Sequence, residues 1–431
     1  MARRQLPTIH SVRQTLGETT FAALSVRNYR LFVMGQAVSL SGTWMQTVAQ
    51  GLLVLQLTGS GTALGIVTAL QTLPVLLFGA WGGLIADRYP KRQILYVVMA
   101  VSGLASLLMG ALTVAGTIEL WMIYVIATIL GLIKVFENPT RQTFVREMVG
   151  NDLLRNAVSL NQTEMNLARV IGPLIAGVMV ATVGLGVCFI ANGLSFGVVI
   201  ATLALMRARE LHPSKPVPRA KGQLQEGFRY VAATPVLRDI LLMMAIIGTF
   251  TYEFTVILPL FAEFTLGNGE TGYAMLTAGM GIGAVVGGLY TASRKARDPK
   301  TLVRSAALFG GSMFLLAAAP NLALAIGAMI VVGFFSVNFT SLASVTLQLS
   351  ARSTMQGRVM ALWSIAFLGT TPIGGPIIGA IGEHAGPRWG VLVGGVAALV
   401  AAALGLLTAR RAAAQASGAS SPTAMEGQAA E

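Results

Sequence analysis

Gly79-Ala-Trp-Gly-Gly-Leu-Ile-Ala-Asp-Arg-Tyr-Pro-Lys-Arg92 ends a long apolar segment with one acid and three bases. Gly79 and Gly83 lie four residues apart, a spacing that lets a neighbouring helix approach closely. The charged side chains of this stretch are costly in hydrocarbon, so they mark a short loop at a membrane surface. Because the loop is basic, we expect it on the cytoplasmic side.

The composition is that of a membrane protein. Of 431 residues, 54% are hydrophobic and only 11% are charged, which leaves too little polar surface for a soluble protein of this size. The net charge of +13 does not indicate nucleic acid as a partner, because no basic domain with interleaved aromatic residues occurs. One cysteine and three scattered histidines predict no disulfide and no metal site.

Twelve apolar stretches of about 20 residues or more, the length of a membrane-spanning helix, follow one another along the chain. They lie at about 30–56, 61–86, 93–116, 119–140, 157–183, 186–207, 237–263, 271–293, 301–319, 322–347, 358–382 and 388–410. The fold class is therefore an all-α polytopic membrane protein with two six-helix bundles. The predicted parts are an N-terminal arm (1–28), a first bundle (29–207), a linker (208–235), a second bundle (236–411) and a disordered tail (412–431).

The basic residues predict the orientation of these spans. With both termini in the cytoplasm, 27 of the 30 lysines and arginines fall in cytoplasmic segments or at their edges. Such a bias follows the positive-inside rule, so we expect a multi-pass protein of the inner membrane with both termini cytoplasmic.

The two halves resemble repeats of each other. Gly82-Gly83-Leu84 recurs as Gly287-Gly288-Leu289, and a glycine–proline motif in the fifth span recurs in the eleventh. The residues of this helix-packing motif are Gly172, Pro173 and Gly177, with Gly375, Pro376 and Gly379 as their counterparts. Repeated six-helix units indicate two bundles on either side of a central path, with the substrate site near the middle of the membrane.

The loop at 83–92, read as Gly83-x-x-x-Asp87-Arg88-x-Pro90-Lys91-Arg92, resembles the signature between spans two and three of the major facilitator superfamily. A proline stands here in place of the usual loop glycine. The segment Asn166–Gly177 is similar to the glycine–proline motif of drug/proton antiporters. Asn138-Pro-Thr-Arg-Gln142 is similar to the enterobactin-exporter-like branch.

The resemblance implies a conformational latch. In the family, the acid at the position of Asp87 faces a helix N-terminus of the other half, where a carboxylate is stabilised. Gly83, Arg88 and Arg92 complete the implied gate. The second half has Ala292 and Ser293 where the acid and base would stand, so the latch is expected on one side only. The alternative is that these charges only set the topology.

Ionisable residues inside the spans are the candidates for proton coupling, because they are costly in a membrane. They are Lys134, Glu137, Glu164, Arg169 and Glu253. Lys134 and Glu137 lie three residues apart on one helix face. We expect Lys134 and Glu164 at similar depths, which predicts a network of the first four residues; the alternative is a neutralised cluster that joins two helices. Glu253 has no neighbouring base in its own helix and is a candidate proton carrier or, alternatively, an acid at the outer rim.

Polar residues in the first span form a stripe on one helix face. Gln36, Thr43, Gln46 and Gln50 belong to this stripe, and Asn338 and Trp363 are further candidates for lining a cavity. Hydrogen bonds between helices are the alternative role for the stripe. A polar and aromatic cavity suits amphipathic organic molecules better than simple ions.

The sequence therefore predicts a secondary active transporter and not an enzyme, since no nucleophile, base or metal constellation occurs and no P-loop is present. We expect proton-coupled efflux of small amphipathic compounds by alternating access, in a lipid-embedded monomer. The proton gradient is the energy source, and no cofactor is expected. The alternatives are an exporter of an endogenous siderophore or metabolite and, in another class, a non-transporting membrane sensor or assembly factor.

Overall fold

The structure is a computed structural model that describes residues 21–212, 223–293, 299–352 and 355–419. These ranges are helical and contain no strand, which confirms the all-α prediction. The first helices are η1 (Ala22–Ser25), α2 (Arg27–Thr58), α3 (Gly61–Arg88), α4 (Lys91–Val114), α5 (Leu120–Val149), α6 (Leu154–Val183), α7 (Leu185–Leu205) and η2 (Ala208–Glu210). The later ones are α8 (Gln223–Ala233), α9 (Pro235–Phe250), α10 (Phe254–Leu260), η3 (Phe261–Thr265), α11 (Gly269–Ser293), α12 (Pro299–Ala318), α13 (Leu322–Ser350), α14 (Gln356–Leu368), α15 (Thr371–His384) and α16 (Pro387–Ala419).

Eleven stretches of the described chain are long and apolar enough to cross a membrane. The helix α2 is not among them, although its 32 residues exceed the length that a span needs. Its polar stripe, with Gln36, Gln46 and Gln50, makes α2 less apolar than the others. The eleven stretches together with α2 correspond to the twelve predicted spans.

The chain divides into two compact units. The first unit contains residues 1–53 and 73–218, and the second contains residues 54–72 and 219–431. The segment 54–72, which joins α2 to α3, thus packs with the second unit instead of the first. The predicted bundle limits of 29–207 and 236–411 stay a prediction. The arm up to residue 20, residues 213–222 of the linker and the tail from residue 420 lie outside the described residues.

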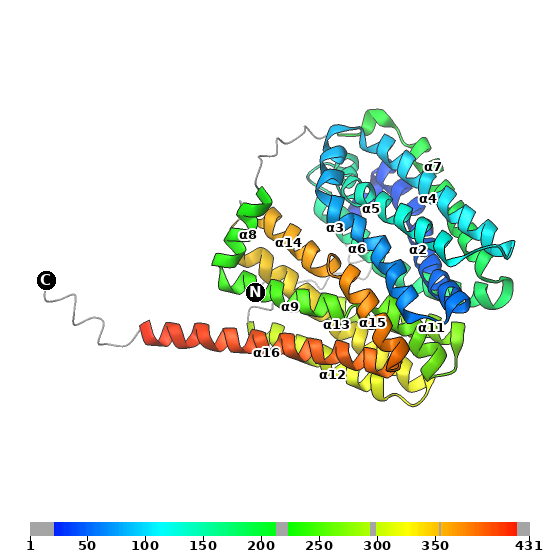
Figure 1. The fold of residues 1–431 in the computed structure, drawn as a ribbon. Coiled ribbons are helices and arrows are strands. Elements are labelled where there is room, and N and C mark those ends of the chain that lie inside the picture. Colours follow the sequence, from blue (N-terminus) through cyan, green and yellow to red (C-terminus); the bar gives the residue numbers. More distant parts are fainter. Residues whose placement is uncertain (1–20, 213–222, 294–298, 353–354, 420–431) are drawn as a thin grey trace, which may run out of the picture. The chain divides into compact units, whose positions relative to one another are not determined.

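Glycines bring helices together in the same way inside each unit. In the first unit, a methyl group added at Gly103 of α4 would lie 3.2 Å from the carbonyl oxygen of Gly193 in α7. In the second unit, a methyl group at Gly310 of α12 would lie 2.9 Å from the carbonyl oxygen of Gly395 in α16. Figure 1 shows α4 beside α7 and α12 beside α16. The third and sixth spans of each half therefore pack in the same way, as expected for a repeat.

Two of the predicted spans are broken in the second unit. The span predicted at 237–263 divides into α9, α10 and η3, and Thr251, Tyr252 and Glu253 lie at the first break. The span predicted at 358–382 divides into α14 and α15 at Gly369 and Thr370. Backbone of this kind inside a spanning segment is tolerated where other parts of the protein surround it.

The ends of the described chain also differ from the prediction. The tail is predicted to be disordered from residue 412, but α16 continues through Ala419. Its last turns are rich in alanine, which has the highest helix propensity of all residues. The amphipathic piece predicted near residues 223–232 is the helix α8, and Glu226 of α8 forms a 2.7 Å ion pair with Arg358 of α14.

Candidate functional site

The loop between α3 and α4 is fixed to the rest of the first unit by Lys91. The Lys91 Nζ atom lies 2.8 Å from Oε1 of Glu147 near the end of α5, and both side chains are more than nine-tenths buried. Arg92 donates hydrogen bonds of 3.2 Å to the Tyr96 hydroxyl and to the carbonyl oxygen of Ala204. This second bond satisfies one of the last carbonyl groups of α7. We call this part of the first unit the basic end.

The predicted latch is only partly described. Gly83 is buried, Arg88 is exposed on the last residue of α3, and the side chain of Asp87 lies outside the description. The side chains of Ala292 and Ser293 lie outside it as well. In the described structure, Lys91 of the same loop makes the buried ion pair, and Lys91 was not among the residues of the implied gate. The role of Asp87 stays a prediction.

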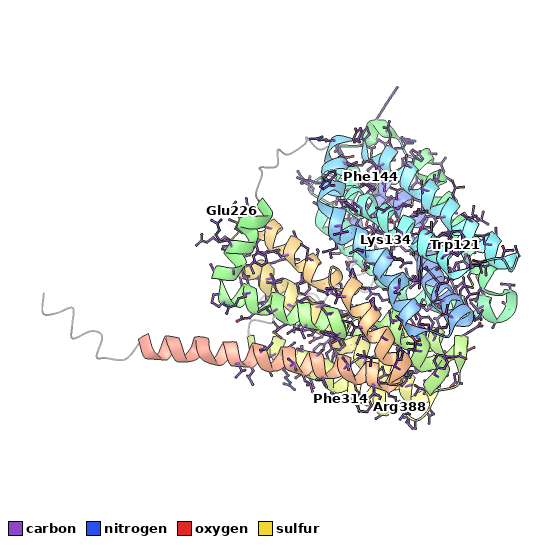
Figure 2. All side chains as sticks on the ribbon, viewed as in Figure 1. Trp121, Lys134, Phe144, Glu226, Phe314 and Arg388 are labelled. Atoms are coloured by element: carbon purple, nitrogen blue, oxygen red, sulfur yellow. The ribbon has the colours of Figure 1, made fainter. Side chains whose placement is uncertain are left out.

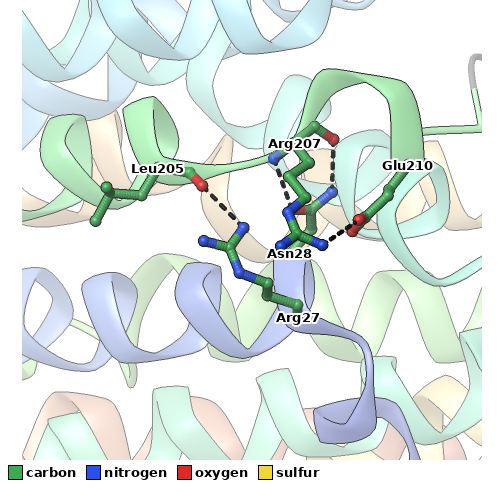
Figure 3. Close-up of polar contacts among 5 residues, drawn as sticks. All are labelled: Arg27, Asn28, Leu205, Arg207 and Glu210. Atoms are coloured by element: carbon green, nitrogen blue, oxygen red, sulfur yellow. Dashed lines mark hydrogen bonds and ion pairs between the residues drawn. The ribbon is translucent and has the colours of Figure 1, made fainter.

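The start of α2 is joined to the end of α7 at the same basic end. Figure 3 shows the Asn28 side chain, which donates to the carbonyl oxygen of Arg207 and accepts from its backbone N–H, both at 3.0 Å. Arg27 donates a 3.0 Å hydrogen bond to the carbonyl oxygen of Leu205, and Arg207 forms an ion pair with Glu210. Asn28 is completely buried, so these hydrogen bonds hold the start of α2 against the end of α7.

The predicted network of the candidate proton-coupling residues in the first unit stays a prediction, and the described contacts concern its members one by one. Lys134 and Glu137 are half-buried and close enough to attract each other. Figure 2 shows Lys134 along α5 between Trp121 and Phe144. The helices α5 and α6 meet at the turn of residues 150–153, so Lys134 lies farther from that turn than Glu164 does. Counted from that turn, the two residues differ in depth by about 7–8 Å at about 1.5 Å per residue, so the helix register does not place them level.

Glu164 lies beside a different base. Its side chain is 9% exposed, and Arg141 of α5, which is 8% exposed, is the cation that attracts it. The guanidinium group of Arg169 instead lies 5.0 Å from the ring centre of Trp44 in α2. The sequence did not identify Arg141 as a site residue. It lies in the motif Asn138–Gln142, which indicated only the family branch, and it counted among the basic residues that predict the orientation.

Glu253 lies at the break between α9 and α10 in the second unit and is 1% exposed. It is therefore not a residue of an exposed rim. A methyl group added at Gly374 of α15 would lie 2.9 Å from Oε1 of Glu253, and one added at Gly375 would lie 3.4 Å from Oε2. Glu253 is thus placed against the first turn of α15, where backbone N–H groups are unpaired within the helix. Thr371 at the start of α15 also faces this carboxyl group.

The predicted cavity-lining residues are mostly buried among helices. Gln46 accepts a 2.7 Å hydrogen bond from the Asn192 amide of α7, and Asn338 donates a 2.9 Å bond to Thr291 and accepts one from Ser305. Gln46 and Asn338 therefore form hydrogen bonds between helices, which is the alternative role given above for the polar stripe. For the other candidates, cavity lining stays a prediction. Gln36, Gln50 and Trp363 are buried, and Thr43 is half-buried with its hydroxyl bonded to its own helix.

The glycine–proline motif packs helices together in both units. A methyl group at Gly172 of α6 would lie 2.7 Å from the carbonyl oxygen of Ser41 in α2. In the second unit, Gly375 faces Gly65, and Gly379 faces Gly61. Pro173 and Pro376 lie inside α6 and α15, and Gly177 is half-buried. The motif residues of the eleventh span therefore hold the start of α3.

Comparisons with known proteins agree with this architecture. The chain is 26% identical to the multidrug efflux pump Tap of Mycolicibacterium fortuitum, over 80% of this chain and 88% of that protein. It is 24% identical to the enterobactin exporter EntS of Shigella flexneri, over 88% of this chain and 91% of that protein. In the solved structures, a bacterial homologue of the lysosomal transporter Spinster has the same fold, with a TM-score of 0.71 at 14% identity over 89% of this chain and 96% of that chain.

The family model described as transmembrane secretion effector matches residues 18–430. The relatives and structural neighbours named above are transporters or their homologues and not enzymes. The eleven apolar stretches make the chain a multi-pass membrane protein. It belongs to the transmembrane secretion effector family of the major facilitator superfamily, a family of membrane transporters with efflux pumps among its relatives.

Proposed function

We propose that this protein exports small amphipathic organic compounds across a bacterial inner membrane in exchange for protons. It works as a monomer in the lipid bilayer by alternating access, with both termini in the cytoplasm. The distribution of lysine and arginine supports the orientation. The likeness to the multidrug efflux pump Tap and to the enterobactin exporter EntS supports export as the direction of transport.

The observation that carries proton coupling is a pair of buried carboxyl groups. Glu164 in the first unit and Glu253 in the second unit are 9% and 1% exposed. Among the described residues, none donates a hydrogen bond of normal geometry to either carboxyl oxygen of these two side chains. An ionised carboxylate without such donors is costly inside a membrane, whereas a carboxyl group that binds and releases a proton is a usual reason to keep an acid there.

The substrate class rests on aromatic and polar surroundings in the second unit. The Tyr252 ring packs against Phe367 at 5.1 Å between ring centres, and Phe367 stacks on Trp363 at 6.3 Å. Flat apolar groups of a substrate bind well against such rings. Export of an endogenous siderophore or metabolite is the second candidate, because the likeness to EntS extends over 88% of this chain.

Transport by the purified protein in lipid vesicles tests this function. Ethidium and tetraphenylphosphonium represent lipophilic cations, and a catecholate siderophore represents the second candidate. We expect an imposed pH gradient to accelerate ethidium transport about tenfold or more, and we expect Glu164→Gln and Glu253→Gln each to remove that acceleration. Glu119→Gln is the matched control, since Glu119 is exposed ahead of α5.

Three outcomes contradict parts of the proposal. Transport that ignores the pH gradient excludes proton coupling. Transport of the siderophore but of neither cation selects the second candidate. Absence of flux with every compound, in protein that is folded by thermal unfolding, favours a sensor or assembly factor.

A further inference from the structure

We propose that the first unit contains a proton-binding site built from three helices, with Arg141 as the counter-ion of the proton-binding carboxyl group. Its members are Gln36 of α2, Thr140 and Arg141 of α5 and Glu164 of α6. The proposal rests on the proposed proton coupling and adds to it the residues that position the carboxyl group.

The helix contacts place these side chains at one depth. The Tyr29 hydroxyl donates a 2.8 Å hydrogen bond to the carbonyl oxygen of Ala157, so these two residues are level on α2 and α6. Gln36 follows Tyr29 by seven residues, and Glu164 follows Ala157 by seven residues. Seven residues are about two helical turns, so Gln36 and Glu164 are again level and on the facing sides of parallel helices.

The helix α5 reaches the same level from the opposite direction. The rings of Phe32 in α2 and Phe144 in α5 pack edge to face at 5.9 Å. Because α2 and α5 run antiparallel, four residues onward in α2 correspond to four residues back in α5, which brings Gln36 level with Thr140. Arg141 follows Thr140 directly, and its charge attracts Glu164.

Polar atoms in this group have no hydrogen-bond partner among the described residues. They are Nε2 of Gln36, Oγ1 of Thr140, Nε and Nη1 of Arg141 and both carboxyl oxygens of Glu164. The four side chains are between 0% and 9% exposed. Buried polar atoms nearly always have a hydrogen-bond partner in proteins. A group of buried polar atoms without partners at one level therefore indicates a site whose hydrogen bonds change during function.

The charges near Glu164 allow one proton to change that pairing. Arg141 attracts it from α5, and the Tyr29 hydroxyl lies nearer the basic end, bonded to the carbonyl oxygen of Ala157. Lys134 and Glu137 lie farther along α5, and Arg169 lies farther along α6. Neither α7 nor η1 contains an ionisable residue apart from Cys188. When a proton binds the carboxylate, its attraction to the nearby Arg141 charge is lost and the carboxyl group becomes neutral.

An aromatic layer separates this site from the basic end. Tyr29, Phe32 and Phe144 are completely buried and lie between the site and the start of α2. A proton reaches Glu164 from that end only when α2, α5 and α6 move apart, so proton binding is linked to the conformation of the first unit.

Infrared difference spectroscopy of the purified protein tests the site without any substrate. We compare spectra at about pH 5 and about pH 8, where a carboxyl group that changes protonation gives a carbonyl stretching band. We expect this band to lose intensity in Glu164→Gln. In Arg141→Gln we expect the difference in band intensity between the two pH values to fall by about half or more, because the positive charge that stabilises the carboxylate is removed. Arg141→Lys keeps the charge and is expected to retain the band.

Folding and transport controls keep the test decisive. We expect Arg141→Gln and Glu164→Gln to lower the thermal unfolding midpoint singly and the double variant to recover part of that loss, because the pair is then removed as a whole. An unchanged infrared band in folded Glu164→Gln and Arg141→Gln overturns the site. If the wild-type protein shows the infrared band but no proton-driven transport, only the proposed function is contradicted.

Discussion

Lys91→Met is expected to lower the free energy of unfolding by about 3–5 kcal/mol, because it removes one partner of a buried ion pair with Glu147. The Lys91 and Glu147 side chains are 8% and 9% exposed and lie 2.8 Å apart, so water cannot replace the missing charge. Denaturant unfolding of the purified protein, followed by tryptophan fluorescence, measures the change.

Two further variants show whether burial causes the effect. The double variant Lys91→Met with Glu147→Leu removes both charges and is expected to recover most of the lost stability. Arg207→Gln breaks a surface pair whose side chains are 64% and 41% exposed, and we expect a loss of about 1 kcal/mol or less. Equal losses in Lys91→Met and Arg207→Gln would mean that Lys91 is not held in a buried pair.

Gly379→Leu is expected to open the contact between α15 and the start of α3. A methyl group added at Gly61 would lie 2.5 Å from the carbonyl oxygen of Gly379, so the two helices touch through their backbones. Beside them, Glu383 accepts hydrogen bonds of 2.7–3.0 Å from Ser60 and from the hydroxyl and backbone N–H of Thr62. Because Thr62 lies in the first turn of α3, the carboxylate also interacts with the helix dipole.

Cysteine labelling measures this opening. Cys188 is the only cysteine, so a Cys188→Ala protein can carry one new cysteine at Ala63, which is 6% exposed. Overpacking costs about 1–3 kcal/mol, so we expect Gly379→Leu to raise the labelling rate by about tenfold or more. Glu383→Gln is expected to raise it by less. Unchanged labelling in folded Gly379→Leu would contradict a closed contact at this position.

The sequence predicts the helices of this protein well and their irregular parts poorly. Hydrophobic length locates the eleven apolar stretches of the described chain, and repeated glycines such as Gly82 and Gly287 indicate the repeat, because both depend on local patterns. The breaks at Thr251 and Gly369 are not predicted. Between Pro235, the first residue of α9, and Glu253 there is no proline that would indicate a break, and Gly369 is one of many glycines in the spans. Such breaks depend on neighbouring helices that satisfy the freed backbone groups.

The candidate site is predictable by residue type but not by partner. Glu164 and Glu253 are identified because acids inside apolar stretches are rare. Their neighbours depend on the depth of each helix relative to the turn that joins it to the next. For that reason Lys134 is predicted beside Glu164, whereas the helix register places Arg141 there. Similarly, Gln46 has the same sequence signature whether it faces water or bonds to Asn192.

Substrate-driven proton movement tests exchange of an organic compound for protons most directly. Vesicles that contain the wild-type protein and a pH-sensitive dye receive an ethidium gradient at equal pH on both sides. Because coupling between two transported species is reciprocal, the account predicts that ethidium flux drives protons in the opposite direction, and that Glu164→Gln with Glu253→Gln abolishes this movement. Ethidium flux in wild type without any proton movement would contradict it.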